Sequence, residues 1–485
     1  MNTNGVRTLL EHAPEQQLTS RLFLKTLALI YFAAFYSLSG QIVGLAGSDG
    51  ILPFDALMAR AGEHLGADAW LQLPSLFWFY GSDRALQYAA WLGCLFSVTL
   101  LLGIRPLLSL LALFLLYLSL ATAGQIFLNF QWDYLLLEAG FLAIFLHRGA
   151  NRLTILLFHW LLFRLRFMSG VAKLASGDPS WRDLSALRHY FETQPLPHVG
   201  AWYAHQLPEL LLQAGTAFAL FSELVVPFFI FLPRRMRLSA AAITLFMQLC
   251  IIATSNHNFF NLLTIALCLF LLDDRLLERW LPAWLRPATP ARREATGRLK
   301  PALTLSVALL ILSVSLPLMF TMVTGIQPHR TIAVWSDAVR RFGIGNAYHV
   351  FPTMQTERIE LLIEGSRDGS DWQPYRFRWR PDDPARPPAF IVPHQPRLDW
   401  LLWFAPTQAP PGTIVLDRLL HRLVTGSEPV SALLEHDPFS ADPPRYIRIL
   451  AYRYRFTSAQ ERAASGAWWQ REFIGHFPYI PPRRP

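Results

Sequence analysis

The stretch RLRFMSGVAKLASGDPSWRDLSALRHYFETQPLPHVGAWYAHQLP, residues 164–208, begins inside an apolar run and ends in a segment rich in aromatic and polar residues. The run starts at Leu153, so Arg164, Arg166 and Lys173 would lie within a membrane-spanning helix. A charge that faces lipid there costs roughly 2.5–3.5 kcal/mol on insertion scales. These three cations therefore need partners inside the protein.

Helical spacing separates the three cations into two faces. Arg166 and Lys173 fall on one face together with Gly170, and the Ser169-Gly170 pair would let a neighbouring helix approach closely. Arg164 lies about 160° round the helix axis from that face, so it needs a partner of its own. For Lys173, near the helix end, snorkelling to the membrane interface is the alternative to an ion pair.

Composition indicates a membrane protein. Of the 485 residues 53% are hydrophobic and only 16% are charged, against about 25% charged in soluble proteins. The net charge of +9 would suggest a nucleic-acid partner in a soluble chain. Here the basic residues cluster in loops between apolar runs, which is typical of cytoplasmic loops and excludes nucleic-acid binding as the explanation.

Nine apolar runs follow one another along the chain, and most are long enough to span a hydrocarbon layer of about 30 Å. They cover residues 22–45, 85–104, 107–127, 130–147, 153–175, 209–232, 238–255, 258–273 and 302–323. The predicted fold is a polytopic α-helical membrane protein of about nine transmembrane helices, with a C-terminal β-rich extracytoplasmic domain.

Loop charges predict the orientation. Arginines concentrate in alternate connections, for example Arg148 and Arg152 in one and Arg234, Arg235 and Arg237 in another, whereas the intervening loops carry few basic residues. Basic loops stay in the cytoplasm, so the N-terminus is expected there.

The same alternation divides the chain into two domains. We expect a transmembrane domain over 1–323 with outer loops 46–84 and 176–208, and an outer domain over 324–485.

Six charged residues within the apolar runs are candidates for a buried cluster: Asp133, Glu138, Arg164, Arg166, Lys173 and Glu223. Similar depth along the helices predicts the pairs Glu138–Arg166 and Asp133–Lys173, with Glu223 level with Arg164. Such pairs either set the registry between helices or line a ligand or reaction site. Sequence alone leaves both interpretations open.

The outer domain shows strand periodicity. Apolar residues alternate over 359–364, a Gly- and Ser-rich turn covers 365–371, and Tyr, Phe and Trp alternate with Arg over 375–380, which predicts a hairpin. A further strand is predicted over 447–456, and residues 412–436 have helical spacing.

Nine blocks of sequence carry a family resemblance: FLNFQWDYLLLEAGFLAIF (127–145), RFMSGVAKLASGDPSW (166–181), HYFETQPLPHVGAWYAHQLP (189–208), ELVVPFFIF (223–231), NHNFFNLLTIAL (256–267), IEGSRDGSDW (363–372), VPHQPRLDWLLWFA (392–405), PPRYIRILAYRYRF (443–456) and WWQREF (468–473). With these blocks the chain resembles the lipase maturation factor family. The resemblance implies a polytopic protein, in eukaryotes of the endoplasmic reticulum membrane, that helps dimeric secreted lipases to fold on the lumenal side. The membrane part also resembles, more distantly, the vitamin K-dependent carboxylase group.

Two family-like motifs supply further candidate residues. The outer loop contributes Trp181, His189, Tyr190, Glu192, Gln194, Trp202, Tyr203 and His205, and the outer domain contributes His394, Gln395, Arg397, Asp399 and Trp400. Each histidine is either an acid–base group or an interface residue with a satisfied ring, and the second is the commoner case. Arg397 and Asp399 are expected only to pin a turn.

The sequence contains no recognised motif for thiol, metal or cofactor chemistry. Cys94, Cys250 and Cys268 all lie within apolar runs, and no Cys-x-x-Cys pair is present. We find no nucleophile elbow, phosphate loop or zinc motif, and we expect no cofactor and no metal. The chain also lacks an Asn-x-Ser/Thr acceptor, which favours a bacterial homologue in the inner membrane over an animal protein.

The leading hypothesis is a folding factor, not an enzyme, that binds membrane lipid and a secreted client, with a lipase as the family's client. It would use exposed Trp, Tyr and Arg of loop 176–208 and the outer domain, residue types enriched in binding hot spots. The alternative is an intramembrane enzyme in which Glu138, Arg166, Lys173 and Glu223 line a pocket for a lipid-soluble substrate. A transporter is disfavoured, since no inverted repeat is visible.

Overall fold

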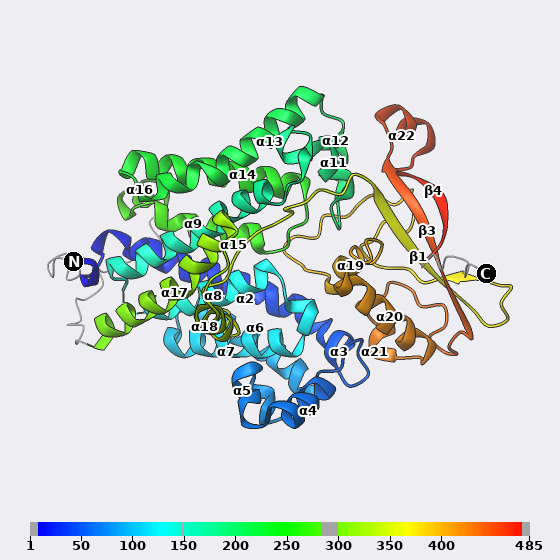
Figure 1. Cartoon of the computed structure of the whole chain (residues 1–485), viewed down its shortest axis with the longest axis horizontal. Coiled ribbons are helices and arrows are strands. Elements are labelled where there is room, and N and C mark those ends of the chain that lie inside the picture. Colours follow the sequence, from blue (N-terminus) through cyan, green and yellow to red (C-terminus); the bar gives the residue numbers. More distant parts are fainter. Residues whose placement is uncertain (1–7, 148, 283–298, 478–485) are drawn as a thin grey trace.

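The computed structural model describes residues 8–147, 149–282 and 299–477, and combines a helical bundle with a small sheet (Figure 1). The bundle lies on the left of Figure 1 and the sheet on the right. Between them lie the short helices α11 (Ala186–Thr193) and α12 (Val199–His205) and the helices α19 (Arg397–Leu402), α20 (Pro410–Val424) and α21 (Glu428–Ser431). The structure therefore agrees with the predicted class, a polytopic helical membrane protein with a C-terminal β-containing part.

All nine predicted apolar runs form helices. Their bounds are α2 Gln17–Ser39, α6 Asp83–Leu101, α7 Pro106–Ala123, α8 Gln131–Ala143, α9 Arg152–Ala175, α13 Glu209–Leu224, α14 Arg234–Thr254, α15 Phe260–Cys268 and α17 Leu299–Thr324. Among the described residues, seven of these are long and apolar enough to cross a membrane. The two helices that do not meet this length are α8 and α15.

The short helices have a simple cause. Gln131 and Asp133 open α8 and leave it 13 residues, about 20 Å at 1.5 Å per residue, which is less than the hydrocarbon thickness. A 3-10 turn, Ile144–Leu146, follows it. The helix α15 is likewise extended by a 3-10 turn, Leu269–Leu271. Both helices pack against α9, which shields them within the bundle.

The helix α9, which contains Arg164, Arg166 and Lys173, lies at the centre of the bundle. In its most apolar stretch 78% of the residues are buried, against 28–56% in the other six candidate spans. It contacts α8, α13, α15 and α17. A Cβ added to Gly170 would lie 2.9 Å from Glu223 Cβ, so the predicted close approach at this glycine is confirmed and α13 is the neighbour.

Shorter helices fill the outer loops and the end of the bundle. Their bounds are α3 Ile42–Ala46, α4 Phe54–Leu65, α5 Ala69–Gln72, α10 Pro179–Arg182, α11 Ala186–Thr193, α12 Val199–His205, α16 Asp274–Trp280 and α18 Arg330–Arg340. Loop 176–208 is thus a series of three short helices. Side-chain caps mark the starts of two of them: Asp178 accepts a hydrogen bond from Ser180 N before α10, and His198 Nδ1 accepts one from Gly200 N before α12, both at 2.9 Å.

The C-terminal sheet is antiparallel with strand order β2-β1-β3-β4. Its strands are β1 Arg358–Ser366, β2 Gln373–Pro374, β3 Tyr446–Phe456 and β4 Trp469–His476, and its helices are α19 Arg397–Leu402, α20 Pro410–Val424, α21 Glu428–Ser431 and α22 Ala459–Ser465. The predicted strands over 359–364 and 447–456 are confirmed, and they pair with Leu361 opposite Ala451. The helical spacing over 412–436 corresponds to α20 and α21.

The predicted strand over 375–380 is wrong. Only Gln373 and Pro374, just before it, pair with β1 as a strand. After them Tyr375 N still donates to Ile363 O of β1 and Arg376 N donates to His436 O, both at 3.0 Å. Phe377 N then donates to Asp382 Oδ2 at 2.7 Å and Trp379 N donates to Asp399 Oδ1 at 3.0 Å. Alternation of aromatic and basic residues arises here in an irregular segment, two of whose backbone donors are satisfied by carboxylates.

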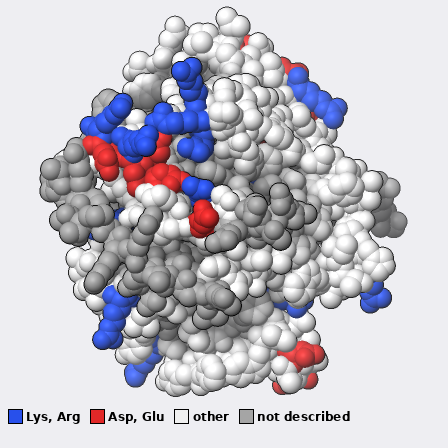
Figure 2. All heavy atoms as spheres, turned by 90° about the vertical axis from the view of Figure 1, so that its left-hand side faces the viewer, with Lys and Arg blue, Asp and Glu red and all other residues white. Residues whose placement is uncertain are grey.

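The end of the bundle away from the sheet gathers charged side chains of both signs (Figure 2). At the start of α14, Arg234 Nε lies 2.5 Å from Asp273 Oδ2. The neighbouring Asp274 accepts from Gln17 N and Thr19 N, at 2.8 and 3.0 Å, where an anion is favoured at a helix N-terminus. These contacts join α2, α14 and α16, elements whose loops the sequence predicts to be cytoplasmic.

Candidate functional site

The six predicted membrane charges do not form one cluster. They lie in three groups, Glu138 with Arg164, Asp133 with Arg397, and Glu223 with Lys173 and Arg166. The predicted pairs Glu138–Arg166 and Asp133–Lys173 are therefore wrong. Depth along a helix fixes the height of a side chain but not the neighbour that it faces, and one partner comes from the outer part of the chain.

Glu138 is the centre of the first group and is wholly buried. It forms an ion pair with Arg164, accepts a hydrogen bond from Tyr348 Oη at 2.8 Å and accepts another from Asn346 N at 3.3 Å. Arg164 in turn donates to Asn346 O at 2.9 Å. Arg164 thus has a partner separate from those of Arg166 and Lys173, as its position on α9 predicts. The segment after α18, through Asn346 and Tyr348, supplies the other members of the group.

Asp133 forms the second group, at the start of α8. Arg397 Nη1 and Nη2 donate to its two carboxylate oxygens at 2.6 and 2.8 Å, and Tyr117 Oη donates at 2.6 Å. Arg397 also donates to Phe127 O at 3.0 Å. A bidentate, charge-assisted pair of this kind is strong and directional. Arg397 therefore anchors the outer motif to the membrane helices, which is more than the predicted pinning of a turn.

Glu223 forms the third group on the shared face of α9. Lys173 Nζ lies 2.7 Å from Glu223 Oε2, and Arg166 Nη1 lies 3.7 Å from Glu223 Oε1. Lys173 also donates to Ser169 Oγ at 3.0 Å and to Val350 O at 3.2 Å. Lys173 is 5% exposed, so an ion pair, and not snorkelling, accounts for its position.

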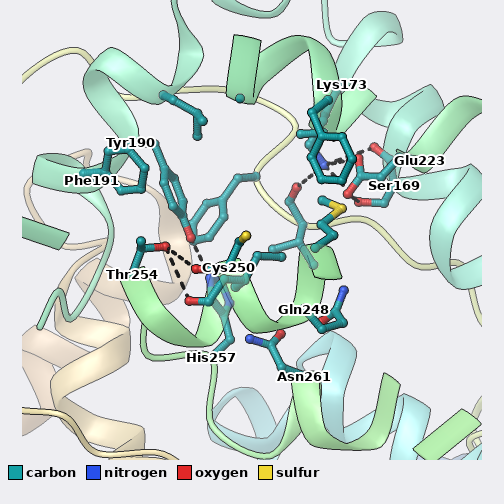
Figure 3. Close-up of a pocket in the computed structure, with 18 of the residues that line it drawn as sticks. Ser169, Lys173, Tyr190, Phe191, Glu223, Gln248, Cys250, Thr254, His257 and Asn261 are labelled. Atoms are coloured by element: carbon teal, nitrogen blue, oxygen red, sulfur yellow. Dashed lines mark hydrogen bonds and ion pairs between the residues drawn. The ribbon is translucent and has the colours of Figure 1, made fainter. Parts of the chain in front are cut away.

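A cavity of about 550 Å³ opens beside this third group, between α9, α13, α14 and loop 176–208. Figure 3 shows Lys173, Ser169 and Glu223 at one side, with Gln248, Asn261 and His257 elsewhere on the wall. Most of the lining is apolar, from residues such as Leu165, Phe218 and Ile251. Glu138 is not among the lining residues, so the set proposed for an intramembrane enzyme is divided between two places.

The candidate residues of loop 176–208 mostly hold the loop to its neighbours. Trp181 Nε1 donates to Pro352 O at 3.0 Å, and Trp202 Nε1 donates to Thr457 O at 2.8 Å. Glu192 Oε2 accepts from Phe456 N at 2.6 Å, and Gln194 Nε2 donates to Thr254 O at 3.0 Å. These bonds connect the loop with the outer sheet on one side and with α14 on the other.

The four ring-bearing residues that complete this motif differ in environment. Tyr190 Oη bonds to His257 Nε2 at 2.7 Å, and His205 Nε2 lies 3.7 Å from Glu192 Oε2. His189 is half-buried, and Tyr203 is 58% exposed.

The outer-domain motif 394–400 docks on the start of the chain. His394 Nδ1 bonds to Ser37 Oγ at 2.8 Å, Gln395 N donates to the same oxygen at 3.0 Å, and Arg397 N donates to Gln41 Oε1 at 2.8 Å. Trp400 packs its ring against Trp132 with the ring centres 5.1 Å apart. Asp399 differs from these residues, because its carboxylate bonds within the outer domain, where it accepts a hydrogen bond from Trp379 N.

Two buried histidines outside the candidate membrane spans, His394 and His257, are poor acids or bases near neutral pH. Burial lowers the pKa of His394 to about 4, helped by Arg397 and Arg378. Burial also lowers the pKa of His257 to about 4, helped by Lys173. A histidine with so low a pKa is neutral at pH 7, so both behave as satisfied interface residues.

The expectation of an exposed aromatic binding surface is largely wrong. Trp181, Trp202 and Trp400 are 4%, 3% and 4% exposed, and Trp469 is 1% exposed. Their large apolar rings join the loop, sheet and bundle, where burial of an aromatic side chain is worth most. Exposed large apolar side chains of the outer part are scattered, for example Phe390 and Tyr446, and two of them are neighbours on β4, Phe473 and Ile474, which are 52% and 47% exposed.

Sequence reasoning missed a further buried ionic group, in which Glu360 of β1 lies between two arginines. Arg358 Nη2 is 2.5 Å and Arg380 Nη2 is 2.6 Å from the Glu360 carboxylate. Arg358 also donates to the backbone oxygens of Glu192 at 3.0 Å and Pro195 at 3.1 Å in the outer loop. A charged residue between apolar ones in β1 was the available signal. Among the described residues, no group of three or more His, Cys, Asp or Glu side chains is placed to hold a metal ion.

Comparison with known proteins gives matches along nearly the whole chain. Residues 18–279 match the lipase maturation factor transmembrane domain, and residues 344–480 match the lipase maturation factor C-terminal domain. The chain is 33% identical to lipase maturation factor 2 of Gallus gallus, over 94% of this chain and 80% of that protein. It is also 33% identical to lipase maturation factor 1 of Mus musculus, over 96% of this chain and 87% of that protein. No solved structure matches the chain.

Proposed function

Because the chain belongs to the lipase maturation factor family, we propose that it is a membrane-bound maturation factor that helps a lipase to reach its folded, active state. The observation that carries this proposal is the match of both parts of the chain, in order, at about one-third identity. The alternative of an intramembrane enzyme is not favoured, since the relatives are named as maturation factors.

The way in which the outer part is attached supports this function. Arg397 of α19 and Tyr348 before β1 reach the buried carboxylates Asp133 and Glu138 of the bundle. A buried charge that loses its partner is costly, so these contacts hold the sheet in one position above the helices. A fixed outer part would present the same surface to each client at the membrane.

For the client contact we propose the outer edge of β4. Within the described residues β4 pairs as a strand only with β3. Beyond Trp469, whose N–H donates to Pro384 O, its other edge has no strand partner there and lies next to the exposed side chains of Phe473 and Ile474. Free strand edges and exposed apolar residues are what a partly folded client with unpaired strands can bind. This surface replaces the buried tryptophans as the candidate.

We further propose that the N-terminus faces the cytoplasm and that the sheet lies on the lumenal or periplasmic side. The alternation of basic loops supports this orientation. The test is labelling with a membrane-impermeant thiol reagent after introducing a cysteine at exposed positions outside the spans, Ser370 in the turn after β1 or Glu278 in α16. Ser370→Cys should react from outside intact cells or spheroplasts, and Glu278→Cys should react only after the membrane is permeabilised.

The function is tested by deleting the gene in its native host and measuring the amount and specific activity of secreted lipases. We expect a lipase that is synthesised but inactive or aggregated, and recovery on re-expression. Unchanged specific activity of every secreted lipase would contradict the proposal.

The surface is tested in the same host with Phe473→Asp, against Arg471→Asp on the same strand as the matched control. Phe473→Asp should reduce lipase activity severalfold at an unchanged level of this chain, because it places a charge in the apolar contact. Equal activity with both variants would exclude β4 as the client surface while leaving the maturation role intact.

A further inference from the structure

We propose that the cavity beside Glu223 binds an anionic amphiphile with one long aliphatic chain, with its head group at Arg166 and its chain between α13 and α14. The cavity volume of about 550 Å³ falls within the roughly 300–1,000 Å³ of small-molecule sites. Such a ligand is distinct from the client lipase, so the site adds a function to the maturation role.

The charges of the residues that line the cavity favour an anionic ligand. Among the described lining residues there are two permanent cations, Arg166 and Lys173, and one carboxylate, Glu223. Arg166 and Glu223 are 6% and 4% exposed, so this excess positive charge lies away from water. A buried charge without a counterion is costly, and an anionic head group would remove that cost.

The hydrogen bonds identify Arg166 as the cation with spare capacity. Lys173 already has Glu223, Ser169 and Val350 as partners. Arg166, by contrast, donates to Ser222 Oγ at 3.2 Å and touches the weakly accepting sulfur of Met247, and its closest approach to Glu223 is 3.7 Å. Its Nε has no hydrogen-bond partner among the described residues.

A guanidinium offers five donors in a planar fork that suits carboxylate and phosphate oxygens. The amide nitrogen of Asn261, a residue that also lines the cavity and is 2% exposed, is likewise without a partner in the part of the chain that the structure describes. Two buried donors in one cavity point to an acceptor-rich, anionic group as the ligand head.

The apolar walls and the rim favour an aliphatic chain that enters from the bilayer. Leu211 of α13 and Phe246 of α14 line the cavity and are 54% and 58% exposed. Both belong to candidate membrane spans, so their exposed sides face hydrocarbon. The small residues Gly215 and Ala219 of α13 leave space along the wall between them.

Cys250 provides a direct readout of occupancy. It lines the same cavity and is exposed, whereas the other two cysteines, Cys94 and Cys268, are buried. A chain lying between α13 and α14 would cover the Cys250 thiol (Figure 3). The rate at which a membrane-permeant maleimide labels the full-length protein therefore reports on ligand binding without any lipase assay.

The experiment uses the full chain in nanodiscs of phosphatidylcholine, titrated with oleate, oleoyl lysophosphatidate or oleyl alcohol. We expect one or both anions to slow Cys250 labelling at concentrations at which oleyl alcohol, with the same chain, does not. The anion that acts at the lower concentration identifies the head group as a carboxylate or a phosphate. Equal protection by oleyl alcohol and both anions would overturn the proposal.

Variants separate the head-group contact from the chain contact. Arg166→Gln removes the excess charge and leaves the Lys173–Glu223 pair, so half-protection should need about ten times more of the anion, while Arg166→Lys should retain part of the affinity. Ala219→Phe should fill the cavity and abolish protection. Ala217→Phe, at an exposed position of the same helix outside the lining, is the control.

Thermal unfolding of each variant establishes that it is folded before labelling is compared. If folded Arg166→Gln and Ala219→Phe are both protected by the anion as well as the wild type, the site does not exist as described. Because lipase maturation is not measured, this failure would leave the proposed function of the chain standing, and loss of the maturation role would leave the ligand site standing.

Discussion

Asp133 and Arg397 form a buried pair in which each charge depends on the other, since they are 0% and 1% exposed. Arg397→Met leaves the Asp133 carboxylate with only the Tyr117 hydroxyl as a side-chain donor. We expect a loss of roughly 3–5 kcal/mol in the free energy of unfolding, as is usual when one partner of a buried pair is removed. Thermal unfolding in detergent, followed by circular dichroism, measures the effect.

The control for this pair is the double variant Asp133→Asn with Arg397→Met. It leaves no unpaired charge, so it should be more stable than Arg397→Met alone. Arg453→Met, which removes an exposed arginine 3.0 Å from Glu472, should change the unfolding temperature little. If the double variant is less stable than Arg397→Met, the ion pair is not the source of the loss.

Asp399 makes the stability of the outer domain dependent on pH. Burial raises the pKa of its carboxyl to about 6, although the Trp379 N–H and Arg380 act in the opposite direction. The unfolded-state value is about 3.9. Between pH about 4 and about 6 the folded state therefore binds more protons than the unfolded state, so its stability falls as the pH rises.

The variant Asp399→Asn keeps an acceptor for Trp379 N and does not titrate. Relative to this variant, the wild type should lose about 2–3 kcal/mol of stability between pH 4 and pH 6, as measured by denaturant unfolding at several pH values. Asp442→Asn, at an exposed carboxylate, should keep the wild-type slope. Parallel stability curves for wild type and Asp399→Asn would contradict the assignment.

At the scale of elements, the packing of α9 on α13 depends on Gly170. A leucine here would place its Cβ 2.9 Å from Glu223 Cβ and equally close to Leu224, so the helices must separate and the Lys173–Glu223 pair must lengthen. We expect Gly170→Leu to cost about 1–3 kcal/mol or more, as overpacking does, and to lower the amount of folded protein in the membrane.

Ala175→Leu is the matched control for this helix, since Ala175 is exposed near the end of α9. It should leave the amount of protein and its unfolding temperature close to wild type. An equal effect of both substitutions would show that bulk anywhere on α9 matters, and not the contact with α13.

The elements of the outer domain differ in how much of their structure is local. The strands β1 and β3 are long, alternate in polarity and pair along nine residues, so their periodicity predicts them correctly. The segment 375–380 alternates equally well, but its Phe377 and Trp379 N–H groups donate to the carboxylates of Asp382 and Asp399. Side-chain acceptors from elsewhere in the chain thus override strand propensity.

For the molecule as a whole, the attachment of loop 176–208 to the sheet depends on Arg358, which is 1% exposed. The Arg358 guanidinium donates hydrogen bonds to backbone oxygens of the loop and forms an ion pair with the Glu360 carboxylate. Arg358→Lys cannot reproduce this planar fork, so we expect faster hydrogen exchange in peptides covering residues 186–206. Arg445→Lys, at an exposed position just before β3, should not change exchange there. Unchanged exchange in Arg358→Lys would mean that other contacts suffice.

The sequence by itself determined the membrane class, the nine helical runs, the two long strands and the requirement that the cations of α9 have partners. These features depend on run length, periodicity and the cost of a charge in hydrocarbon, all of which are local. It also placed Arg164 on a face separate from that of Arg166.

Only the tertiary structure decided which partners these charges have. Asp133 meets Arg397 across 264 positions of sequence, and Glu138 meets Tyr348 across 210. Depth in the membrane cannot predict such pairs, because the facing direction of each helix follows from packing of the whole bundle and from a segment that enters it from outside. For the same reason the tryptophans that a local view assigns to a client surface are buried between loop, sheet and bundle.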